Sequence, residues 1–546
     1  MYKTLPTASK TLLIGFALTF FAVNPKTYDP FNVTRFLIVA VIASILLILL
    51  VTKRSWIPIK NHRIILILSA TFFIHLILVL IFSQANTEQQ LFGVFGRNMG
   101  FISYVSLVVI FLAAMQNVSK EFLKTFYDLI IFIGIISVAY SLIQSQNLDP
   151  LSWINNHSPI IGFFGNPNFN SAFLGMTAGS LLVNLLSKNR RIFIFSISYI
   201  LLSLFLIKES NSIQGFFVFG SIFIIFIVLL TFKIQRFYRY RIPIIFITIS
   251  LIVFAILDVL QKLPWKSFFF KTSVTQRGDL WRAAIDMGKD HPFFGVGIDS
   301  YLDFHYRSRD SVAAGRGWAT ELTNDAHNVF LNFFATGGFP LLVIYSLIVI
   351  YTLVSGIKVL KRMNGIDHKF VSLFFIWIGY LVQSFISINQ ITLAVLSWTL
   401  SGVIIGYEKI SNTEDLVNHI SKTSKKRNSS SSIQVIVGII IGCLIGGTPV
   451  LNDSKIYTAL STGKIVLLQD VVKFRPKNVT YLNIVAEVFE KNNLNEDSLK
   501  VAQFCVENFP NSAFAWSVIY RSQLVSQDER DKAKRKILEI NPYAKF

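Results

Sequence analysis

The chain has 546 residues, of which 53% are hydrophobic and 15% are charged, and its mean hydropathy is +0.56. This composition excludes a soluble globular protein, because 51 Phe residues cannot be buried in the one or two cores that such a length offers. The net charge of +21 does not indicate a nucleic-acid partner here, because most Lys and Arg residues lie in short loops between apolar runs.

Apolar runs long enough to cross a bilayer recur through most of residues 10–450. We predict an all-α, polytopic membrane bundle of about twelve spanning helices plus a thirteenth. The predicted spans are residues 11–24, 34–51, 64–83, 100–115, 122–145, 168–186, 192–207, 213–232, 242–260, 327–354, 370–388, 391–407 and 433–450. The first span has no small-residue cleavage site after it, so we expect it to be retained as a helix.

Lys and Arg are concentrated in alternate loops between these spans, which predicts the orientation of the bundle. The basic loops are Lys53–Arg63, Lys188–Arg191, Lys233–Arg241 and Lys358–Lys369, and the loops poor in basic residues are 84–99, 146–167 and 208–212. The basic loops are expected in the cytoplasm together with the N-terminus. The long 261–326 loop is therefore predicted to be extracytoplasmic.

The charge pattern also predicts the domain organisation. Residues 1–409 form the membrane domain, the basic and Ser-rich residues 410–432 form a cytoplasmic linker, and the span 433–450 carries residues 451–546 back across the membrane. In this last part, Pro-containing turns recur about 33 residues apart, as in tetratricopeptide-type helical hairpins. Plain amphipathic helices are the alternative.

Two of the predicted extracytoplasmic segments place polar groups at the membrane surface. A Gly-rich segment ending at Arg97 leads to the fourth span, and Asn166-Pro167-Asn168 leads to the sixth. Taken alone, Arg97 could be an interfacial anchor, and the asparagines could be helix caps.

The third segment is the 261–326 loop together with the start of the tenth span. An amphipathic helix is predicted around Arg277, ending at His291-Pro292. Asn324 or Asp325 is the predicted N-cap of the tenth span, which would place His327 in its first turn. There the helix dipole would keep the imidazole neutral, as a general base must be. A solvated cap is the alternative.

Further along the tenth span, Gly337-Gly338 and Pro340 are expected to kink or break the helix.

Taken in order along the chain, these segments resemble the O-antigen ligase and polymerase superfamily, also called the Wzy-C domain family. The resemblance extends from about Gly93 to Gly402. The motifs that carry it are Gly96-Arg97-x-x-Gly100, Gln144…Asp149-Pro150…Trp153, Phe164-Gly-Asn166-Pro-Asn168, Arg277-x-x-x-Trp281, Pro292-x-x-Gly295-x-Gly297 and His327-Asn328-x-x-Leu331…Gly337-Gly338.

The resemblance implies a GT-C-like glycosyltransferase of the bacterial cytoplasmic (inner) membrane, with its active site and C-terminal domain extracytoplasmic. Such an enzyme transfers or polymerises glycan from a polyprenyl-diphosphate-linked donor onto a hydroxyl of a glycan, lipid or protein acceptor. It inverts the anomeric centre and needs neither a metal nor a cofactor. Further expected partners are membrane lipids and, through residues 451–546, a chain-length regulator or envelope assembly proteins.

The resemblance also implies the site residues. His327 and Arg277 are the expected catalytic residues, as general base and as ligand of the leaving diphosphate. The expected substrate-binding residues are Arg97, Gln214, Arg282, Asn166, Asn168 and Asn328. Arg282 ranks lower, because it lies five positions after Arg277 and points to another side of the helix. Asp29 is a reserve candidate for general base, with a turn residue as the alternative.

The chain departs from the family pattern at Gln214, where relatives usually carry the arginine of a Ser-Arg-Gly motif. Lys208 or Arg97 is expected to supply the missing charge. This departure and the extracytoplasmic repeat tail favour a polymerase, or transfer to a surface polymer other than lipid A.

Two functions of other classes stay open from the sequence alone. One is a transporter or flippase of envelope precursors, which twelve spans would suit. The other is an assembly scaffold that uses residues 451–546 as a binding module.

Overall fold

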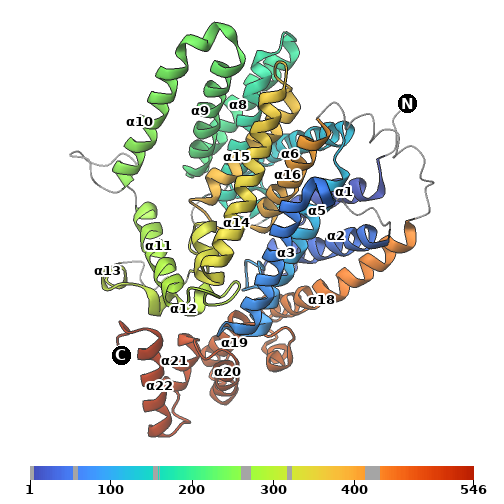
Figure 1. The fold of residues 1–546 in the computed structure, drawn as a ribbon. Helices are drawn as coiled ribbons and strands as arrows, with labels where there is room; N and C mark the ends of the chain where they lie inside the picture. Colours follow the sequence, from blue (N-terminus) through green and yellow to red (C-terminus); the bar gives the residue numbers. More distant parts are fainter. Residues whose placement is uncertain are drawn as a thin grey trace.

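The computed structural model describes residues 5–52, 59–151, 158, 160–259, 272–316, 323–411 and 431–546. Within these ranges the chain is helical and contains no β-strand. The predicted all-α class is therefore confirmed, and the protein is a polytopic helical membrane protein (Figure 1).

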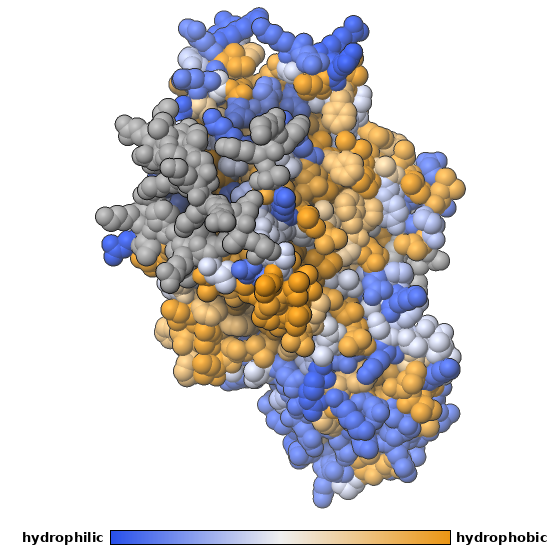
Figure 2. All heavy atoms as spheres, turned by 90° about the vertical axis from the view of Figure 1, so that its right-hand side faces the viewer, coloured by the Kyte–Doolittle hydropathy of each residue, from blue (hydrophilic) through white to orange (hydrophobic). Residues whose placement is uncertain are grey.

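Nine helices in the described ranges are long and apolar enough to cross a bilayer, and two shorter apolar helices accompany them. A helix overlaps each of the predicted spans. Figure 2 shows a broad apolar surface over the body of the molecule, with hydrophilic surface at its upper and lower ends. The bundle helices are α1 (Thr7–Phe21), α2 (Asn32–Thr52), α3 (Ile59–Phe82), α5 (Phe101–Asn117), α6 (Lys120–Ser145), α7 (Pro167–Ser180), α8 (Arg190–Glu209), α9 (Gln214–Lys233), α10 (Arg241–Val259), α14 (Val329–Arg362), α15 (His368–Ser384) and α16 (Ile391–Ile410).

Helix α16 is buried within the bundle, and small residues let it approach its neighbour α5. A Cβ atom at Gly402 would lie 2.3 Å from the Phe111 carbonyl oxygen, and one at Gly406 would lie 2.3 Å from that of Met115. Because lipid tails are as apolar as the side chains, helices in a membrane associate largely through such close van der Waals contact. Helix α16 is thus packed closely against α5, and it also contacts α14 and α15.

Helix α14 is broken at Gly338, where φ is 74° and ψ is −179°, as Gly337-Gly338 and Pro340 predicted. The turn 292–297 fills the break and bonds to the backbone groups around it. These bonds run from Val296 N–H to Ala335 O (2.8 Å), from Gly297 N–H to Thr336 O (3.2 Å) and from Phe339 N–H to Pro292 O (2.8 Å). The Pro-x-x-Gly-x-Gly and Gly-Gly motifs are thus two sides of one contact, which ties the long loop to the bundle.

The described part of the long loop is mostly helical, with α11 (Thr272–Asp290), α12 (Tyr301–Ser308) and α13 (Ser311–Ala314). Helix α11 ends just before His291-Pro292, as predicted. In Figure 1 these helices gather at the end of the bundle opposite the turn between α9 and α10.

The C-terminal helices lie at this same end (Figure 1). They are α19 (Val479–Lys491), α20 (Asn495–Asn508), α21 (Ala513–Arg521) and α22 (Gln527–Ile540), and they share a hydrophobic core separate from that of the bundle. Helix α19 pairs with α20, and α21 pairs with α22. The second pair begins 34 residues after the first, close to the predicted period. Membership of the tetratricopeptide class stays a prediction.

Helix α18 (Ser432–Thr462) joins the bundle to this domain and extends beyond the predicted span 433–450. It continues because Ile456 and Ala459, 0% and 1% exposed, are buried in the C-terminal core. The predicted domain boundary at 450 therefore lies inside one helix. Most of the predicted linker 410–432 lies outside the described residues.

Candidate active site

His327 lies immediately before helix α14. The helix N-cap is Asn328, whose side chain accepts two backbone N–H groups of the first turn at 3.0 and 3.1 Å. The prediction that Asn324 or Asp325 caps this helix, with His327 in its first turn, is therefore wrong. The carboxylate of Asp325 instead forms its own turn by accepting the N–H of His327 (2.8 Å), and His327 adopts a φ of 52°. Two successive side-chain turns thus project His327 out of the helix.

The surroundings of His327 keep its imidazole uncharged. Burial, followed by the positive charges of Arg277 and Arg97, lowers the pKa of His327 to about 3. The Nδ1 atom faces the Asp325 carbonyl oxygen at 3.4 Å. When Nδ1 carries the proton toward that carbonyl, Nε2 keeps its lone pair and can accept a proton. The neutral imidazole that we predicted from the helix dipole therefore arises from burial and two arginines.

Arg277 lies on α11, and one nitrogen of its guanidinium is unsatisfied within the described residues. Its Nε is buried without a hydrogen-bond partner in the described part of the chain, and burial lowers the pKa of Arg277. One helical turn later, the indole Nε1 of Trp281 is also buried and without a partner there. Residues four positions apart share a face of a helix. This face of α11 therefore offers two buried N–H donors that have no partner in the described residues.

Arg97 is the second guanidinium beside His327. Its Nε donates to Asn324 Oδ1 (2.9 Å), and its NH1 donates to the preceding carbonyl oxygen (3.2 Å). Burial lowers the pKa of Arg97, while the negative charges of Asp325 and Asp299 oppose that effect. The ion pairs of the described residues include neither Arg97 nor Arg277. Both arginines are close enough for their charges to act on His327, and neither has an ion pair within the described ranges.

Asp299 holds the segment that carries Arg97, a role that sequence analysis missed. Its Oδ2 accepts the backbone N–H groups of Val94 (2.8 Å) and Met99 (3.1 Å), and burial raises its pKa to about 6. Gly100 lets the two ends of this segment approach each other, because a Cβ atom there would lie 2.5 Å from the Gly93 backbone nitrogen. No local pattern around Asp299 signals this contact, since its partners lie about 200 residues earlier in the chain.

The two predicted asparagines serve the start of helix α7. Asn166 is the N-cap of α7 and accepts the N–H of Asn168 (2.8 Å), so the cap alternative describes it. The side chain of Asn168 accepts the hydroxyl of Ser212 (2.8 Å) in the turn that precedes α9. The structure therefore brings Asn168 to the turn that leads into Gln214, and it records no contact of either asparagine with His327 in the described residues.

Gln214 begins α9 and is 1% exposed, yet both polar atoms of its amide lack a partner in the described residues. Gln383 near the end of α15 has the same property and is 0% exposed. Just beyond it, the ring of Phe385 stacks on Phe330 of α14 (4.6 Å between centroids). Buried amides without partners are uncommon in folded proteins. Sequence analysis found Gln214 through the family pattern, but Gln383 had no signal.

Arg282 and Lys208 do not join the His327 cluster. Arg282 donates to Asp279 (2.6 Å) and Asp310 (2.7 Å), so its charge is used within the loop. Lys208 is exposed at the end of α8. The role of Arg282 in substrate binding stays a prediction, and Arg97 is the cation whose charge acts on His327 together with that of Arg277.

Arg35 at the start of α2 is a further buried cation that sequence analysis missed. It is 0% exposed and donates to the carbonyl oxygens of Phe20 (3.3 Å) and Phe163. Nearby, Gln144 donates to Asp149 (2.7 Å) and accepts the Gly162 N–H (2.8 Å), which ties α6 to the loop before α7. Trp153 of the same motif lies outside the described residues.

Asp29, the reserve candidate for general base, forms a turn. Its Oδ1 accepts the N–H groups of the second and third following residues, both at 3.0 Å. The turn alternative therefore describes its contacts. The described residues contain no group of three His, Cys, Asp or Glu side chains that could hold a metal ion.

Comparison with known proteins adds one finding. No curated protein matches the chain. A model of the O-antigen ligase family matches residues 197–346, which include Gln214, Arg277, Arg282 and His327. Arg97 and the two asparagines lie outside the match. Residues 197–346 are thus similar to the O-antigen ligase family, and the protein resembles a membrane glycan ligase or polymerase in general.

Proposed function

We propose that this protein is an inverting membrane glycosyltransferase that uses a glycan linked to a polyprenyl diphosphate. One observation carries the proposal: His327 is kept neutral by burial and by two arginines that have no ion pair in the described residues. The Nε of Arg277 is buried there without a hydrogen-bond partner, and Arg97 bonds to Asn324, which is next to the Asp325 that accepts the N–H of His327. An unpaired cation out of water is costly, so such a site favours an anionic ligand. A diphosphate suits it, because guanidinium groups bind phosphate oxygens in pairs.

The chemistry follows from these roles. His327 accepts the proton of an acceptor hydroxyl while the hydroxyl oxygen attacks the anomeric carbon. The bond from that carbon to the diphosphate oxygen breaks, and the leaving diphosphate keeps the electron pair. Arg277 and Arg97 stabilise its growing negative charge. A single displacement of this kind inverts the anomeric configuration.

Donor binding would also tune the base. A pKa of about 3 makes His327 a weak base in the empty site. The negative diphosphate would offset the charges of Arg277 and Arg97, which are two of the causes of the low pKa. The pKa of His327 then rises toward the range in which an imidazole accepts protons well near neutral pH. The donor would thus activate the base that uses it.

We place the site on the extracytoplasmic face of a bacterial cytoplasmic membrane. The basic turn Gln235–Tyr240 at the opposite end of the bundle supports this orientation through the positive-inside rule (Figure 1). The acceptor is a hydroxyl of a glycan, a lipid or a protein. The uncharged Gln214 favours chain extension on a glycan.

The transporter alternative has less support. Transporters often expose the backbone groups of a broken helix to their substrate. Helix α14 is broken at Gly338, but the turn 292–297 and His75, whose Nε2 lies 2.8 Å from the Gly337 oxygen, bond to the groups around the break. The break is therefore filled by the protein itself.

The test uses purified full-length protein, a synthetic polyprenyl-diphosphate oligosaccharide and EDTA, with wild type and His327→Ala compared by gel. Longer lipid-linked glycan in wild type alone supports a metal-independent polymerase that depends on His327. Consumption of the donor only after a separate acceptor is added supports a ligase. A folded wild-type protein without turnover on any acceptor would overturn the proposal, and solute uptake into liposomes would then favour a transporter.

A further inference from the structure

The C-terminal domain is anchored to the bundle beside the candidate site. Helix α18 lies against α2 through Gly438, Gly442 and Gly446, which follow one another at four-residue spacing. A Cβ atom at Gly442 would lie 2.3 Å from the Cα atom of Val41, so the two backbones touch. Small residues at this spacing are a known means of close helix contact in membranes. Two turns after Gly446, the same face of α18 carries Asp453.

Asp453 links the C-terminal domain to the Arg97 segment through hydrogen bonds. It is 0% exposed, accepts the backbone N–H of Asp29 (2.9 Å) and accepts the hydroxyl of Tyr481. The turn formed by Asp29 holds Asn32, whose side chain donates to the carbonyl oxygen of Gly96 (3.1 Å). This chain of bonds ends one residue before the arginine.

A second link is aromatic. Phe95 lies two residues before Arg97. The centroid of its ring lies 5.5 Å from that of Tyr28 and 5.5 Å from that of Tyr481. Phe95 also packs against the hydrophobic core of the C-terminal domain. Tyr481 therefore touches the Arg97 segment directly and through Asp453.

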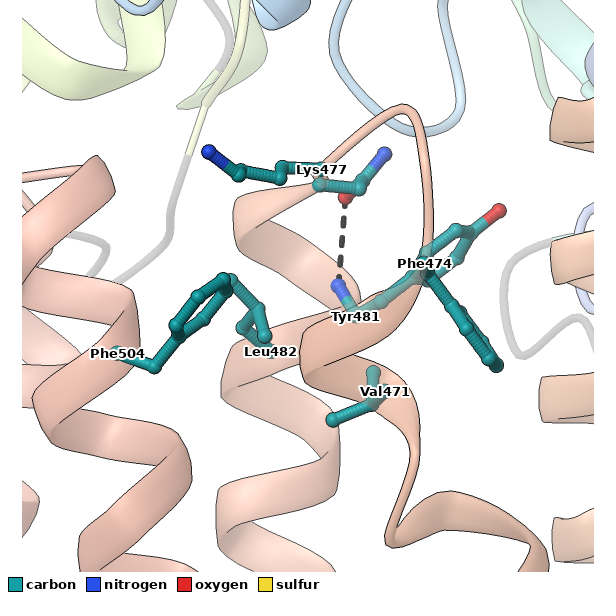
Figure 3. A pocket seen from close by; sticks show the side chains of 7 residues that line it. Val471, Phe474, Lys477, Tyr481, Leu482 and Phe504 are labelled. Atoms are coloured by element: carbon teal, nitrogen blue, oxygen red, sulfur yellow. Dashed lines mark hydrogen bonds between the residues drawn. The ribbon is translucent and has the colours of Figure 1, made fainter.

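A third link holds the start of the same segment. The backbone N–H of Lys477 donates to Glu88 (2.6 Å), and the Lys477 ammonium lies 3.6 Å from that carboxylate. The side chain of Asn86 donates to the carbonyl oxygen of Asn508 (3.1 Å). Figure 3 shows Lys477 and Tyr481 together where α19 begins, with Phe504 of α20 across from them. Both ends of residues 86–97 are thus fastened to the C-terminal helices.

The Arg97 segment, residues 93–100, depends on such neighbours for its conformation. Between α4 (Thr87–Phe92) and α5 it has no regular secondary structure, and Gly96 and Asn98 have φ angles of 75° and 54°. The guanidinium itself has Asn324 as its side-chain partner. A displacement of about 1 Å in a group that positions a substrate can cost roughly 100-fold in rate.

We infer that the C-terminal domain completes the active site, with Asp453 and Tyr481 as positioning residues that hold Arg97 where the donor diphosphate binds. This inference rests on the proposed function. It gives the domain a task within one chain, independent of any outside partner.

The first arm of the test is independent of activity. Hydrogen–deuterium exchange of residues 93–99 is measured in full-length wild type, Asp453→Asn and Tyr481→Phe. Asp470→Asn and Tyr520→Phe make the same chemical changes elsewhere in the C-terminal domain, where Asp470 pairs with Lys473. We expect faster exchange in the first two variants alone. Unchanged exchange in both would overturn the inference, whatever the protein catalyses.

The second arm measures turnover of a polyprenyl-diphosphate oligosaccharide. We expect Asp453→Asn to lower kcat/KM for the donor roughly 10-fold, with a smaller loss in the milder variant Tyr481→Phe. In an Arg97→Ala background, Asp453→Asn should cause no further loss, because it acts through Arg97. Additive losses would contradict positioning through Arg97. If wild type shows no turnover but exchange responds as expected, the proposed function fails while the hold on the segment is supported.

Discussion

The residues around His327, which include Arg277 and Arg97, and the C-terminal domain lie at the same end of the bundle. The two regions differ in whether their Arg and Lys side chains form ion pairs. In the C-terminal domain, Arg521 is paired with Glu490 (3.0 Å) and Lys477 with Glu88 (3.6 Å). At the His327 cluster, Arg277 has no ion pair in the described residues, and its Nε has no hydrogen-bond partner there. Paired cations contribute to the fold, whereas a cation without an ion pair in a desolvated place favours the binding of an anion.

Helix α11 contains both kinds of arginine. The side chain of Arg282 is 48% exposed and bonds to Asp279 and Asp310. The Nε of Arg277 is buried without a partner in the described residues, and the charge of Arg277 lowers the pKa of His327. Both arginines belong to the same helix and the same matched segment, so residue type cannot distinguish their roles. Their different surroundings predict different effects of substitution.

The largest effect is expected at His327 itself. In the proposed function His327 accepts the proton of the acceptor hydroxyl, so His327→Ala should lower kcat by roughly 10²–10⁴-fold. Single-turnover assays of the purified protein measure this loss. His368→Ala, at the start of α15, is the matched control and should retain turnover. Equal activity of both variants would remove His327 from the mechanism.

The second largest effect is expected at Arg277, the arginine of α11 without an ion pair in the described residues. Arg277→Gln should lower kcat/KM for the diphosphate donor roughly 100-fold, because a neutral amide cannot balance the leaving charge. Arg277→Lys should restore part of the loss, since the charge returns without the planar pair of donors. Steady-state kinetics with varied donor measures both. A donor KM and kcat unchanged by Arg277→Gln would contradict the role.

The pH dependence sharpens the electrostatic side of the comparison. A base loses activity as pH falls through its pKa, and kcat/KM reports the free enzyme. With the pKa of His327 at about 3, protonation of this residue should cost no activity between pH 7 and pH 5. Arg277→Gln removes a positive charge and raises that pKa, so the acid limb of kcat/KM should move to higher pH.

The same electrostatics separates kcat from kcat/KM. In wild type, the acid limb of kcat should lie at higher pH than that of kcat/KM. The reason is that bound diphosphate offsets the arginine charges that lower the pKa of His327. Asp325 could itself titrate in this pH range, because burial raises its pKa to about 7. The variant Asp325→Asn controls for that titration. An acid limb unmoved by Arg277→Gln would contradict the coupling between Arg277 and His327.

The smallest effect is expected at Arg282. Its ion pairs are partly exposed, and exposed pairs contribute about 0–1 kcal/mol to the free energy of unfolding. Arg282→Gln should therefore keep turnover within about threefold of wild type and lower the melting temperature slightly. Kinetics and a thermal melt in detergent measure this. A loss as large as that of Arg277→Gln would erase the distinction between paired and unpaired arginines.

Much of the bundle could be predicted from the sequence, because spanning helices depend on local composition. An apolar run such as 213–232 must be helical in lipid, where every backbone group needs an internal partner, and α9 covers it. The break at Gly338 was equally local, since Gly-Gly and Pro weaken a helix wherever they occur. Helix ends were less predictable, and α18 continues past 450 because of side chains that it buries in another core.

The candidate site was only partly predictable. Arg277 and His327 were found through motif order, and the family match covers both. Asp299 and Gln383 had no signal, because their roles depend on segments far away in the chain. The cap of α14 was assigned to Asn324 or Asp325, since three polar residues near one helix start satisfy the same local pattern.

The sequence by itself determined the class of molecule, the approximate positions of its helices and the candidate residues of the proposed chemistry, because hydropathy and residue type act locally. Only the tertiary structure decided which arginines have no ion pair in the described residues, why His327 is neutral and which domain contacts the residues beside Arg97. Electrostatic energies depend on distance and burial in space, and the contacts from Asp453 to Asp29 and from Asp299 to Val94 cross hundreds of residues. Those contacts exist only in the folded chain.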